Sequence, residues 1–272
     1  MLNECRLCGS RDLTLWMRDG RNGDLNYYRC GACALWNYDL DCGMDQTQYT
    51  EKYVGPDDPD HKPNQQIRQS WNYLRTRVNG PGSVMDIGCG NAALLHFAQK
   101  EGWQVRGMEL SAPMAGAIAK DQGIDVTVSN FLEYKPAQDE NYDVVVLRHV
   151  LEHLPDSKLA MRKIGELLKP QGLAFLELPN TGSISYKLKR HLKNHGLKNK
   201  KYTAEWRPGH CNEFCRESFA YLLGVTGFEL VDWRTYSNKL LANSFYRYVP
   251  IASKVRVLAR KETGSSTGVL SA

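Results

Sequence analysis

Residues 83–111, SVMDIGCGNAALLHFAQKEGWQVRGMELS, decide the fold. They read as a short apolar strand, a turn through Gly88 and Gly90, a helix, and a second strand that ends near Glu109. Glycines at such a turn let a ligand approach the backbone, and the start of the following helix favours an anionic group. A carboxylate at the end of the second strand is placed to accept hydrogen bonds from both hydroxyls of a ribose. The stretch therefore predicts a nucleotide-type ligand at the strand ends.

Short strands rich in Val and Leu alternate with helices of about 10–15 residues, which predicts a parallel sheet covered on both faces. The expected strands cover residues 83–88, 104–110, 125–129, 142–149, 173–180, 229–237 and 254–260. The expected helices cover residues 65–78, 93–102, 112–123, 156–172 and 216–228, the first of them leading into the sheet.

The composition is that of a globular protein: of 272 residues, 42% are apolar and 24% are charged. No run approaches the roughly 18 consecutive apolar residues of a membrane-spanning helix. The N-terminus, MLNECRLCGSRD, has no apolar signal-peptide core. We therefore expect a cytoplasmic protein whose eight cysteines are metal ligands or buried side chains rather than disulfides. The formal net charge of +5 is too small to indicate nucleic-acid binding.

The first 40 residues predict a zinc ribbon. Cys5-x2-Cys8 and Cys30-x2-Cys33 form two knuckles separated by 21 residues, a spacing typical of a tetrahedral four-cysteine site. Four thiolates close the coordination sphere, so the ion would be structural. It would stabilise a segment that has too little core to fold alone.

Three further segments follow the ribbon, residues 1–40. A linker and the lead-in helix cover 41–80. The domain of alternating strands and helices covers 81–262 and contains a basic insert at 181–206. The tail at 263–272 is expected to be disordered.

The glycine turn alone also fits the fingerprint of a nicotinamide-dinucleotide site. Asp86, two residues before Gly88, would place a carboxylate near the amino group of an amino-acid-like ligand, whereas it would repel a pyrophosphate. The later stretches HVLEHLPD and LLKPQGLAFLELPN also favour an amino-acid-like ligand over a dinucleotide.

Residues 84–180 resemble the class I S-adenosylmethionine-dependent methyltransferases. VMDIGCGNA, VRGMELS, NYDVVVLRHVLEHLPD and LLKPQGLAFLELPN stand in the family's order and spacing. The resemblance implies a Rossmann-like α/β fold, a seven-stranded sheet in the order 3-2-1-4-5-7-6 with the seventh strand antiparallel. One departure is Ala92, where many members carry a third glycine.

The same resemblance implies which residues surround the cofactor. Asn130 and Phe131 would lie by the adenine, and Leu147, Arg148 and His149 near the reactive sulfonium. Further cofactor contacts are implied for Asp86, Gly88, Gly90, Asn91, Glu109 and Leu110.

A ribbon before such a domain resembles bacterial C- and O-methyltransferases of sugar and antibiotic pathways, including those acting on nucleotide-linked deoxysugars. The leading hypothesis is therefore methyl transfer to a small anionic metabolite, a nucleotide-linked or otherwise phosphorylated sugar. One alternative is an RNA methyltransferase in which ribbon and insert bind phosphates, since some ribosomal RNA enzymes also carry an N-terminal zinc site. Another is a non-catalytic scaffold or sensor that binds the cofactor. The acceptor atom and the oligomeric state do not follow from the sequence.

His149, Glu152 and His153 form an H-x-x-E-H motif, which in some peptidases binds zinc on a sustained helix. Here a strand ends just before His149 and Pro155 follows closely, so a peptidase site is disfavoured. We expect Glu152 and His153 to organise the loop and His149 to line the cofactor pocket.

His210, in RPGHCNEF, is the leading candidate for a catalytic base. It resembles the position of a histidine in sugar methyltransferases with this ribbon, although there the preceding residue is usually Glu and here it is Gly209. The alternative is a surface histidine in a loop. His210 with Cys211 and Cys215 lacks a fourth ligand, which argues against a second metal site there.

The basic insert holds seven cations and no carboxylate between residues 181 and 204, so the rest of the chain sums to 5 − 7 = −2. Ile184, Leu188 and Leu192 are spaced four apart and predict one apolar helical face. Two interpretations stay open, a solvated lid helix and an anion-binding lid beside the acceptor pocket. The cations are Lys187, Lys189, Arg190, Lys193, Lys198, Lys200 and Lys201.

Overall fold

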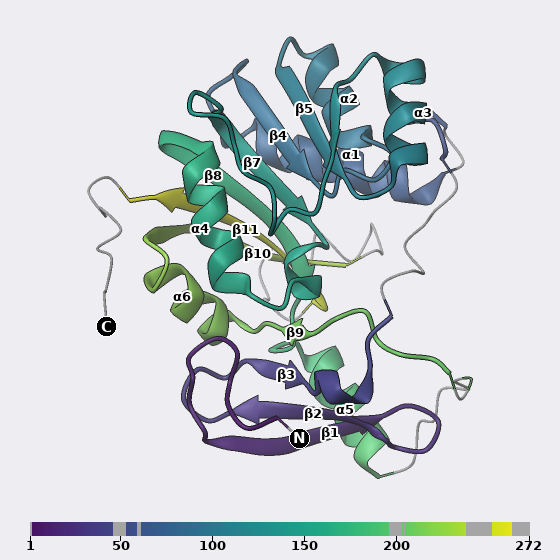
Figure 1. Cartoon of the computed structure of the whole chain (residues 1–272), viewed down its shortest axis with the longest axis vertical. Helices are drawn as coiled ribbons and strands as arrows, with labels where there is room; N and C mark the ends of the chain where they lie inside the picture. Colours follow the sequence, from purple (N-terminus) through teal and green to yellow (C-terminus); the bar gives the residue numbers. More distant parts are fainter. Residues whose placement is uncertain are drawn as a thin grey trace.

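The computed structural model describes residues 2–45, 53–58, 61–195, 203, 205–237 and 252–262. Seven of its strands form one sheet in the order β10-β11-β8-β7-β4-β5-β6 (Figure 1). Numbered within this sheet, the order is the implied 3-2-1-4-5-7-6, and β11 runs antiparallel to both of its neighbours. The strands are β4 (Ser83–Ile87), β5 (Gln104–Glu109), β6 (Val126–Val128), β7 (Tyr142–Arg148), β8 (Leu168–Pro179), β10 (Phe228–Tyr236) and β11 (Lys254–Lys261).

Helices cover both faces of this sheet, as the alternation predicts. Because side chains alternate along a strand, Val84 and Val146 pack towards α1, α2 and α3, while Met85 and Leu147 pack towards α4 and α6. The helices are α1 (Lys62–Arg75), α2 (Ala93–Lys100), α3 (Ala112–Gln122), α4 (Ser157–Leu167) and α6 (Arg216–Gly224).

Several expected element boundaries are wrong. The lead-in helix ends at Arg75 rather than at residue 78, and the helix expected over 216–228 ends at Gly224. The helix expected over 156–172 ends at Leu167, and β8 begins at Leu168. Pro170 has no N–H to donate and disfavours a helical conformation at the residue before it, so the chain leaves the helix early. The lead-in helix begins at Lys62 rather than at residue 65, because Pro63 fits the first turn of a helix.

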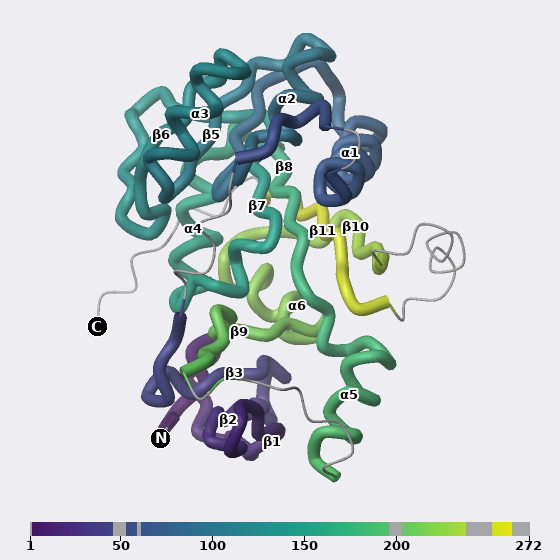
Figure 2. The backbone as a smooth tube through the Cα atoms, turned by 90° about the vertical axis from the view of Figure 1, so that its right-hand side faces the viewer, coloured from purple at the N-terminus to yellow at the C-terminus, as the bar shows by residue number. Residues whose placement is uncertain are grey.

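The ribbon sheet contains β1 (Leu13–Asp19), β2 (Leu25–Cys30) and β3 (Trp36–Tyr38), and β9 (Asn212–Glu213) from far along the chain completes it. β9 lies between the ribbon and the large domain (Figure 2). A short 3-10 helix, η1 (Leu40–Cys42), follows the ribbon. The ribbon is therefore built into the rest of the protein rather than attached by a linker alone.

Helix α5 (Ile184–Asn194), from the basic insert, packs along β1. The guanidinium of Arg190 lies 3.7 Å from the ring centre of Trp16, and Lys193 pairs with Asp19. The expected apolar face points away from the ribbon, since Ile184 and Leu188 are 58% and 55% exposed. The helix thus contacts the ribbon through its cations and Tyr186.

Lys198, Lys200, Lys201 and the expected disordered tail at 263–272 lie outside the described residues. Among the helices that are described, none combines the length and the apolar character needed to cross a lipid bilayer.

Candidate functional site

A cavity of about 400 Å³ opens at the carboxyl ends of β4, β5, β6 and β7. This is the edge of an open parallel sheet where ligands bind, and the volume suits a small molecule. The start of α1 closes one side with His61, Pro63 and Ile67, which the sequence analysis did not single out. Of the residues implied to contact the cofactor, the cavity is lined by Gly88, Gly90, Asn91, Glu109, Leu110, Asn130, Phe131, Arg148 and His149.

The turn after β4 leaves room for a ligand beside its backbone. Gly88 and Gly90 adopt positive φ angles of 68° and 56°. A Cβ on Gly88 would lie 2.6 Å from a methyl of Val150, whereas a Cβ on Gly90 would meet no atom within 4 Å. Ala92 also has a positive φ, 56°, so the position where many relatives carry glycine has the backbone conformation that glycine favours.

Glu109 is held rigidly at the cavity rim. One carboxylate oxygen accepts from the N–H of Gly90 at 3.0 Å, and the other accepts from Leu110 at 2.8 Å and Ser111 at 3.2 Å. A carboxylate has about four acceptor positions, so it can still receive hydrogen bonds from a ligand. Asn91 donates to the carbonyl of Val54 at 2.8 Å and so ties the linker to the cavity.

The far end of the cavity is formed by the turn after β6. Asn130 accepts from the N–H of Leu132 at 3.1 Å and donates to Glu133 at 2.9 Å, which fixes the turn. Phe131 is 5% exposed and faces the cavity beside Met108. The combination of apolar side chains and backbone polar groups suits a flat aromatic base.

Asp86 and Leu147 are buried in β4 and β7 and do not line the cavity. Oδ1 of Asp86 has no hydrogen-bond partner among the described residues. Burial raises the pKa of Asp86 to about 7, against the opposing effect of Arg148. The Asp86 carboxylate is thus a buried polar group behind the glycine turn, and its Oδ1 lacks a compensating hydrogen bond from the described residues.

A buried ionic network fixes Arg148 on the cavity wall. Glu177 accepts from Arg148 at 2.6 Å, from Arg256 at 2.7 Å and from the hydroxyl of Ser70 at 2.6 Å. Burial would raise the pKa of Glu177, but the two arginines outweigh it and lower this pKa to about 2. Glu177 and Arg256 are not predicted as site residues from the sequence, because no local pattern links residues 79 positions apart.

His149 faces the cavity in a strained backbone conformation. Its φ is 56°, in the left-handed region that residues other than glycine seldom adopt. Its Nδ1 lies 3.2 Å from Oε1 of Glu152, whose side chain is 1% exposed. Burial opposes ionisation of Glu152, but the hydrogen bond with His149 contributes to a pKa below the usual range. When Nδ1 donates to this carboxylate, Nε2 carries the lone pair.

His210 lies one ring behind the cavity wall rather than on it. His153 lines the cavity, and the ring of His210 packs against it at 4.6 Å between centroids. Nδ1 of His210 lies 3.1 Å from Oε1 of Glu213. Burial would lower the pKa of His210, but the bond to Glu213 raises it to about 9, so the ring is protonated at neutral pH.

The turn after β7 is not a peptidase helix. Residues Leu151–His153 form the short 3-10 helix η3, which places His149 and His153 in different surroundings. The thiol of Cys211 contacts the carbonyl oxygen of Glu152, and the thiol of Cys215 contacts the carbonyl oxygen of Ala34. These two thiols therefore do not converge with His210 on one site.

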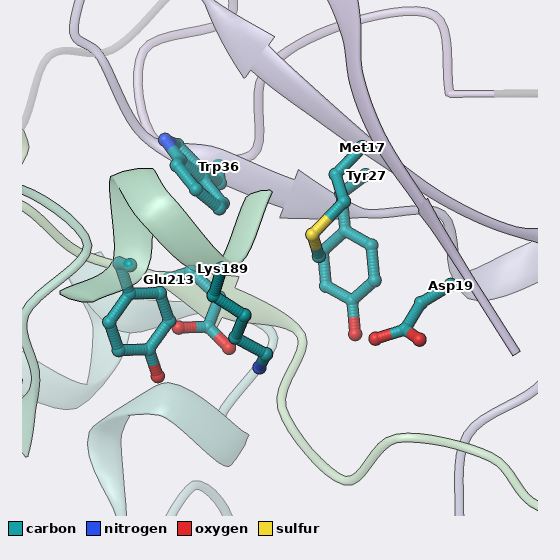
Figure 3. Close-up of a pocket in the computed structure, with 7 residues that line it drawn as sticks. Met17, Asp19, Tyr27, Trp36, Lys189 and Glu213 are labelled. Atoms are coloured by element: carbon teal, nitrogen blue, oxygen red, sulfur yellow. The ribbon is translucent and has the colours of Figure 1, made fainter. Parts of the chain in front are cut away.

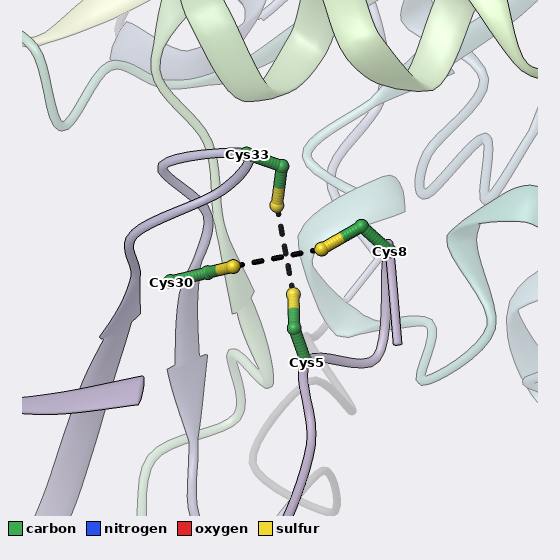
Figure 4. Close-up of side chains that lie close together, drawn as sticks. All are labelled: Cys5, Cys8, Cys30 and Cys33. Atoms are coloured by element: carbon green, nitrogen blue, oxygen red, sulfur yellow. Dashed lines mark hydrogen bonds between the residues drawn. The ribbon is translucent and has the colours of Figure 1, made fainter. Parts of the chain in front are cut away.

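The four ribbon cysteines converge on one point (Figure 4). The sulfur atoms of Cys5 and Cys33 lie 3.6 Å apart, and those of Cys8 and Cys30 lie 3.5 Å apart. Sulfur atoms bound tetrahedrally to zinc at about 2.3 Å lie about 3.8 Å from one another. The cluster therefore has nearly the dimensions of a four-thiolate zinc site.

A second, small cavity of about 30 Å³ lies between the ribbon and α5 (Figure 3). Asp19 and Tyr27 of the ribbon line it, together with Lys189 of α5 and Glu213 of β9. This volume holds a water molecule but not a metabolite. Among the described cations of the insert, Arg190 and Lys193 contact the ribbon, Lys189 lines this small cavity, and none lines the large cavity.

The family described as the methyltransferase domain matches residues 60–232. Ubiquinone biosynthesis O-methyltransferase of Histophilus somni is 33% identical over 133 residues, which cover 44% of this chain and 56% of that protein. The chain thus spans about half the length of the curated relatives it matches.

Solved structures share the fold. The 1,6-didemethyltoxoflavin-N1-methyltransferase of Burkholderia thailandensis, with bound 1,6-didemethyltoxoflavin and S-adenosylhomocysteine, is 18% identical with a TM-score of 0.53, covering 72% of this chain and 78% of that one. A SAM-dependent methyltransferase of Archaeoglobus fulgidus is also 18% identical, with a TM-score of 0.54 and coverage of 72% and 94%.

Proposed function

The chain belongs to the methyltransferase-domain family, and on this premise we propose that it transfers a methyl group from S-adenosylmethionine to a small-molecule acceptor. One observation carries the proposal: the open backbone at Gly90, the rim carboxylate of Glu109 and the ring of His149 all face one cavity. This arrangement supports the proposal that the turn binds a nucleoside and that His149 transfers a proton at the same ligand.

The chain's residues suit the parts of this cofactor in turn. Glu109 would bind the ribose hydroxyls, and Asn130 with Phe131 would hold the adenine. Oδ1 of Asp86, which lacks a partner among the described residues, would pair with the amino group. When bound, the cofactor supplies an electrophilic methyl group on a good leaving group, so positioning provides most of the acceleration.

We propose His149 as the base that takes a proton from an acceptor hydroxyl. It lines the cavity and its Nδ1 is oriented by Glu152, which leaves Nε2 to accept the proton. His210 is the second candidate, and the geometry favours His149, because His210 lies behind His153 and is protonated at neutral pH. An oxygen acceptor agrees with the name of the Histophilus somni relative, an O-methyltransferase.

The finer hypothesis is a nucleotide-linked or phosphorylated sugar acceptor, which rests on the resemblance of the ribbon arrangement. The described cations of the insert give it no support, because Arg190 and Lys193 contact the ribbon and Lys189 lines the small cavity. For the same reason, these three cations do not support RNA as the acceptor. For the ribbon we propose a structural Zn²⁺ ion on Cys5, Cys8, Cys30 and Cys33.

Labelled S-adenosylmethionine tests the activity. The protein is incubated with it and with separate pools of phenols, hydroxylated isoprenoid precursors and nucleotide sugars, and methylated products are identified by mass spectrometry. Product from any pool supports the enzyme and rules out a non-catalytic sensor, and the pool identifies the acceptor class. Failure to bind S-adenosylhomocysteine in titration calorimetry contradicts the proposal outright.

A further inference from the structure

Three side chains that the proposed methyl transfer leaves without a direct role converge behind His149. Glu152 and His153 belong to η3, and His210 precedes β9, almost 60 residues later. One possible ligand atom of each lies within 4.8 Å of those of the other two. In the sequence, Glu152 and His153 belong to one motif and His210 stands beside Cys211, so no local pattern links His210 to the other two.

Both histidines are oriented as metal ligands are. Nδ1 of His153 lies 2.9 Å from the carbonyl oxygen of Gly209, and Nδ1 of His210 lies 3.1 Å from the carboxylate of Glu213. A ring nitrogen that faces a carbonyl or carboxylate donates its proton to it, which makes Nε2 the ligand atom. On His210 the metal ion would displace the Nε2 proton that the ring carries at neutral pH. Histidines that bind metals almost always donate their other N–H to such a group.

Glu152 supplies an oxygen that needs a partner. Its Oε1 bonds to His149, whereas Oε2 is buried and has no hydrogen-bond partner among the described residues. Leaving a buried charged acceptor unpaired is unfavourable, because it has lost its bonds to water. Oε2 of Glu213 also has no hydrogen-bond partner among the described residues, but Glu213 lines the small cavity together with Lys189.

We propose that Glu152, His153 and His210 form a second metal site, separate from the four cysteines, for a divalent first-row transition ion such as Zn²⁺. Two imidazoles and one carboxylate suit such an ion, whereas Mg²⁺ and Ca²⁺ prefer ligands that are all oxygen. Coordination through Oε2 preserves the bond between Oε1 and His149.

Three protein ligands leave at least one coordination position for another molecule. His153 lines the large cavity, so the ion would lie at the wall of that cavity. The role of the ion rests on the proposed function: bound to an acceptor hydroxyl, it would lower the pKa of that hydroxyl and aid proton transfer to His149. Its binding does not depend on that function.

Co²⁺ titration of protein whose four-cysteine cluster already holds zinc tests the site. Co²⁺ on nitrogen and oxygen ligands gives weak d–d absorption, whereas thiolate ligands add intense charge-transfer bands, so the spectrum identifies the site. His191 and His195 lie one turn apart on α5, with ring centroids 4.4 Å apart, and such a pair binds transition ions by itself. All variants therefore carry His191→Gln and His195→Gln as background.

We expect one Co²⁺ per chain beyond the cluster, without charge-transfer bands. His153→Gln and His210→Gln should each lower the Co²⁺ affinity at least tenfold, and Glu213→Gln about tenfold, because it removes the group that orients His210. His96→Gln is the matched control. His96 lies on α2 and its Nε2 lies 3.0 Å from Oδ2 of Asp57, so this substitution should leave the Co²⁺ affinity unchanged.

Absence of Co²⁺ beyond the cluster, or equal affinity in the His153→Gln and His96→Gln variants, overturns the inference and makes the three residues a hydrogen-bonded network alone. Calorimetric binding of S-adenosylhomocysteine reports whether each variant is folded. It also separates the two proposals: missing Co²⁺ with retained S-adenosylhomocysteine binding contradicts only the metal site.

Discussion

Replacing Glu177 by Gln should strongly destabilise the fold. The substitution keeps the side-chain shape but removes the negative charge between two arginines. Arg148 and Arg256 bond to its two oxygens at 2.6 and 2.7 Å, and Ser70 donates a third bond at 2.6 Å. The Glu177 carboxylate itself is 0% exposed. The variant therefore leaves two positive charges without their shared counter-ion.

Two arguments give a similar magnitude. Breaking a buried ion pair by removing one partner is unfavourable by about 3–5 kcal/mol. The pKa of Glu177 is lowered from 4.5 to about 2, which corresponds to about 3 kcal/mol of stabilisation of its ionised form. We therefore expect the free energy of unfolding to fall by about 3 kcal/mol at pH 7.

The same pKa sets the sign of the pH dependence. Because the folded pKa lies below the unfolded value, the stabilisation is fully present above about pH 5 and is lost as the pH falls towards 2. The difference between wild type and Glu177→Gln should therefore shrink over this window. Urea unfolding at pH 7 and pH 4, followed by tryptophan fluorescence, measures this difference in the free energy of unfolding.

Glu229→Gln is the matched control, since Glu229 is exposed on β10. It should change the free energy of unfolding by less than about 0.5 kcal/mol. A Glu177→Gln variant as stable as this control at pH 7 would refute the reasoning that the network holds a buried charge. S-adenosylhomocysteine affinity should fall in Glu177→Gln as well, because Arg148 loses its anchor on the cavity wall.

Three further outcomes are expected. Glu109→Ala should weaken binding of S-adenosylhomocysteine by roughly 1.5–3 kcal/mol in calorimetry, the range for hydrogen bonds to a charged group. If the wild-type protein bound NADH with comparable affinity, the ligand class would be wrong. Cys30→Ser should release stoichiometric zinc, as measured by elemental analysis, and destabilise the ribbon. His149→Gln should lower turnover about 100-fold or more with little change in cofactor affinity, whereas an equal loss in His210→Gln with His149→Gln unaffected would reassign the base.

Much of the lining of the large cavity was expected from the sequence, from local signals at the glycine turn and Glu109 and from the family resemblance at Asn130. The glycine turn after β4, Glu109 at the end of β5 and Asn130 after β6 each follow a strand. In a parallel sheet those ends meet at one edge, so they line one cavity without further information. Asp86 and Leu147 lie within strands instead, and their side chains are buried behind that edge. His61 and Ile67 were missed, because nothing in the sequence places the lead-in helix over the cavity.

The sequence by itself determined the order of strands and helices, the glycine turn and the cysteine knuckles, since periodicity, turn residues and short spacings act over a few positions. Only the tertiary structure decided which distant groups satisfy a buried charge. Glu177 meets Arg256, Glu152 meets His210, and β9 completes the ribbon sheet. It also decided that α5 packs through its cations and leaves Ile184 exposed, because the available partner was the aromatic and acidic surface of β1. Helical spacing defines an apolar face, but the surface that a face meets is set by how the whole chain folds.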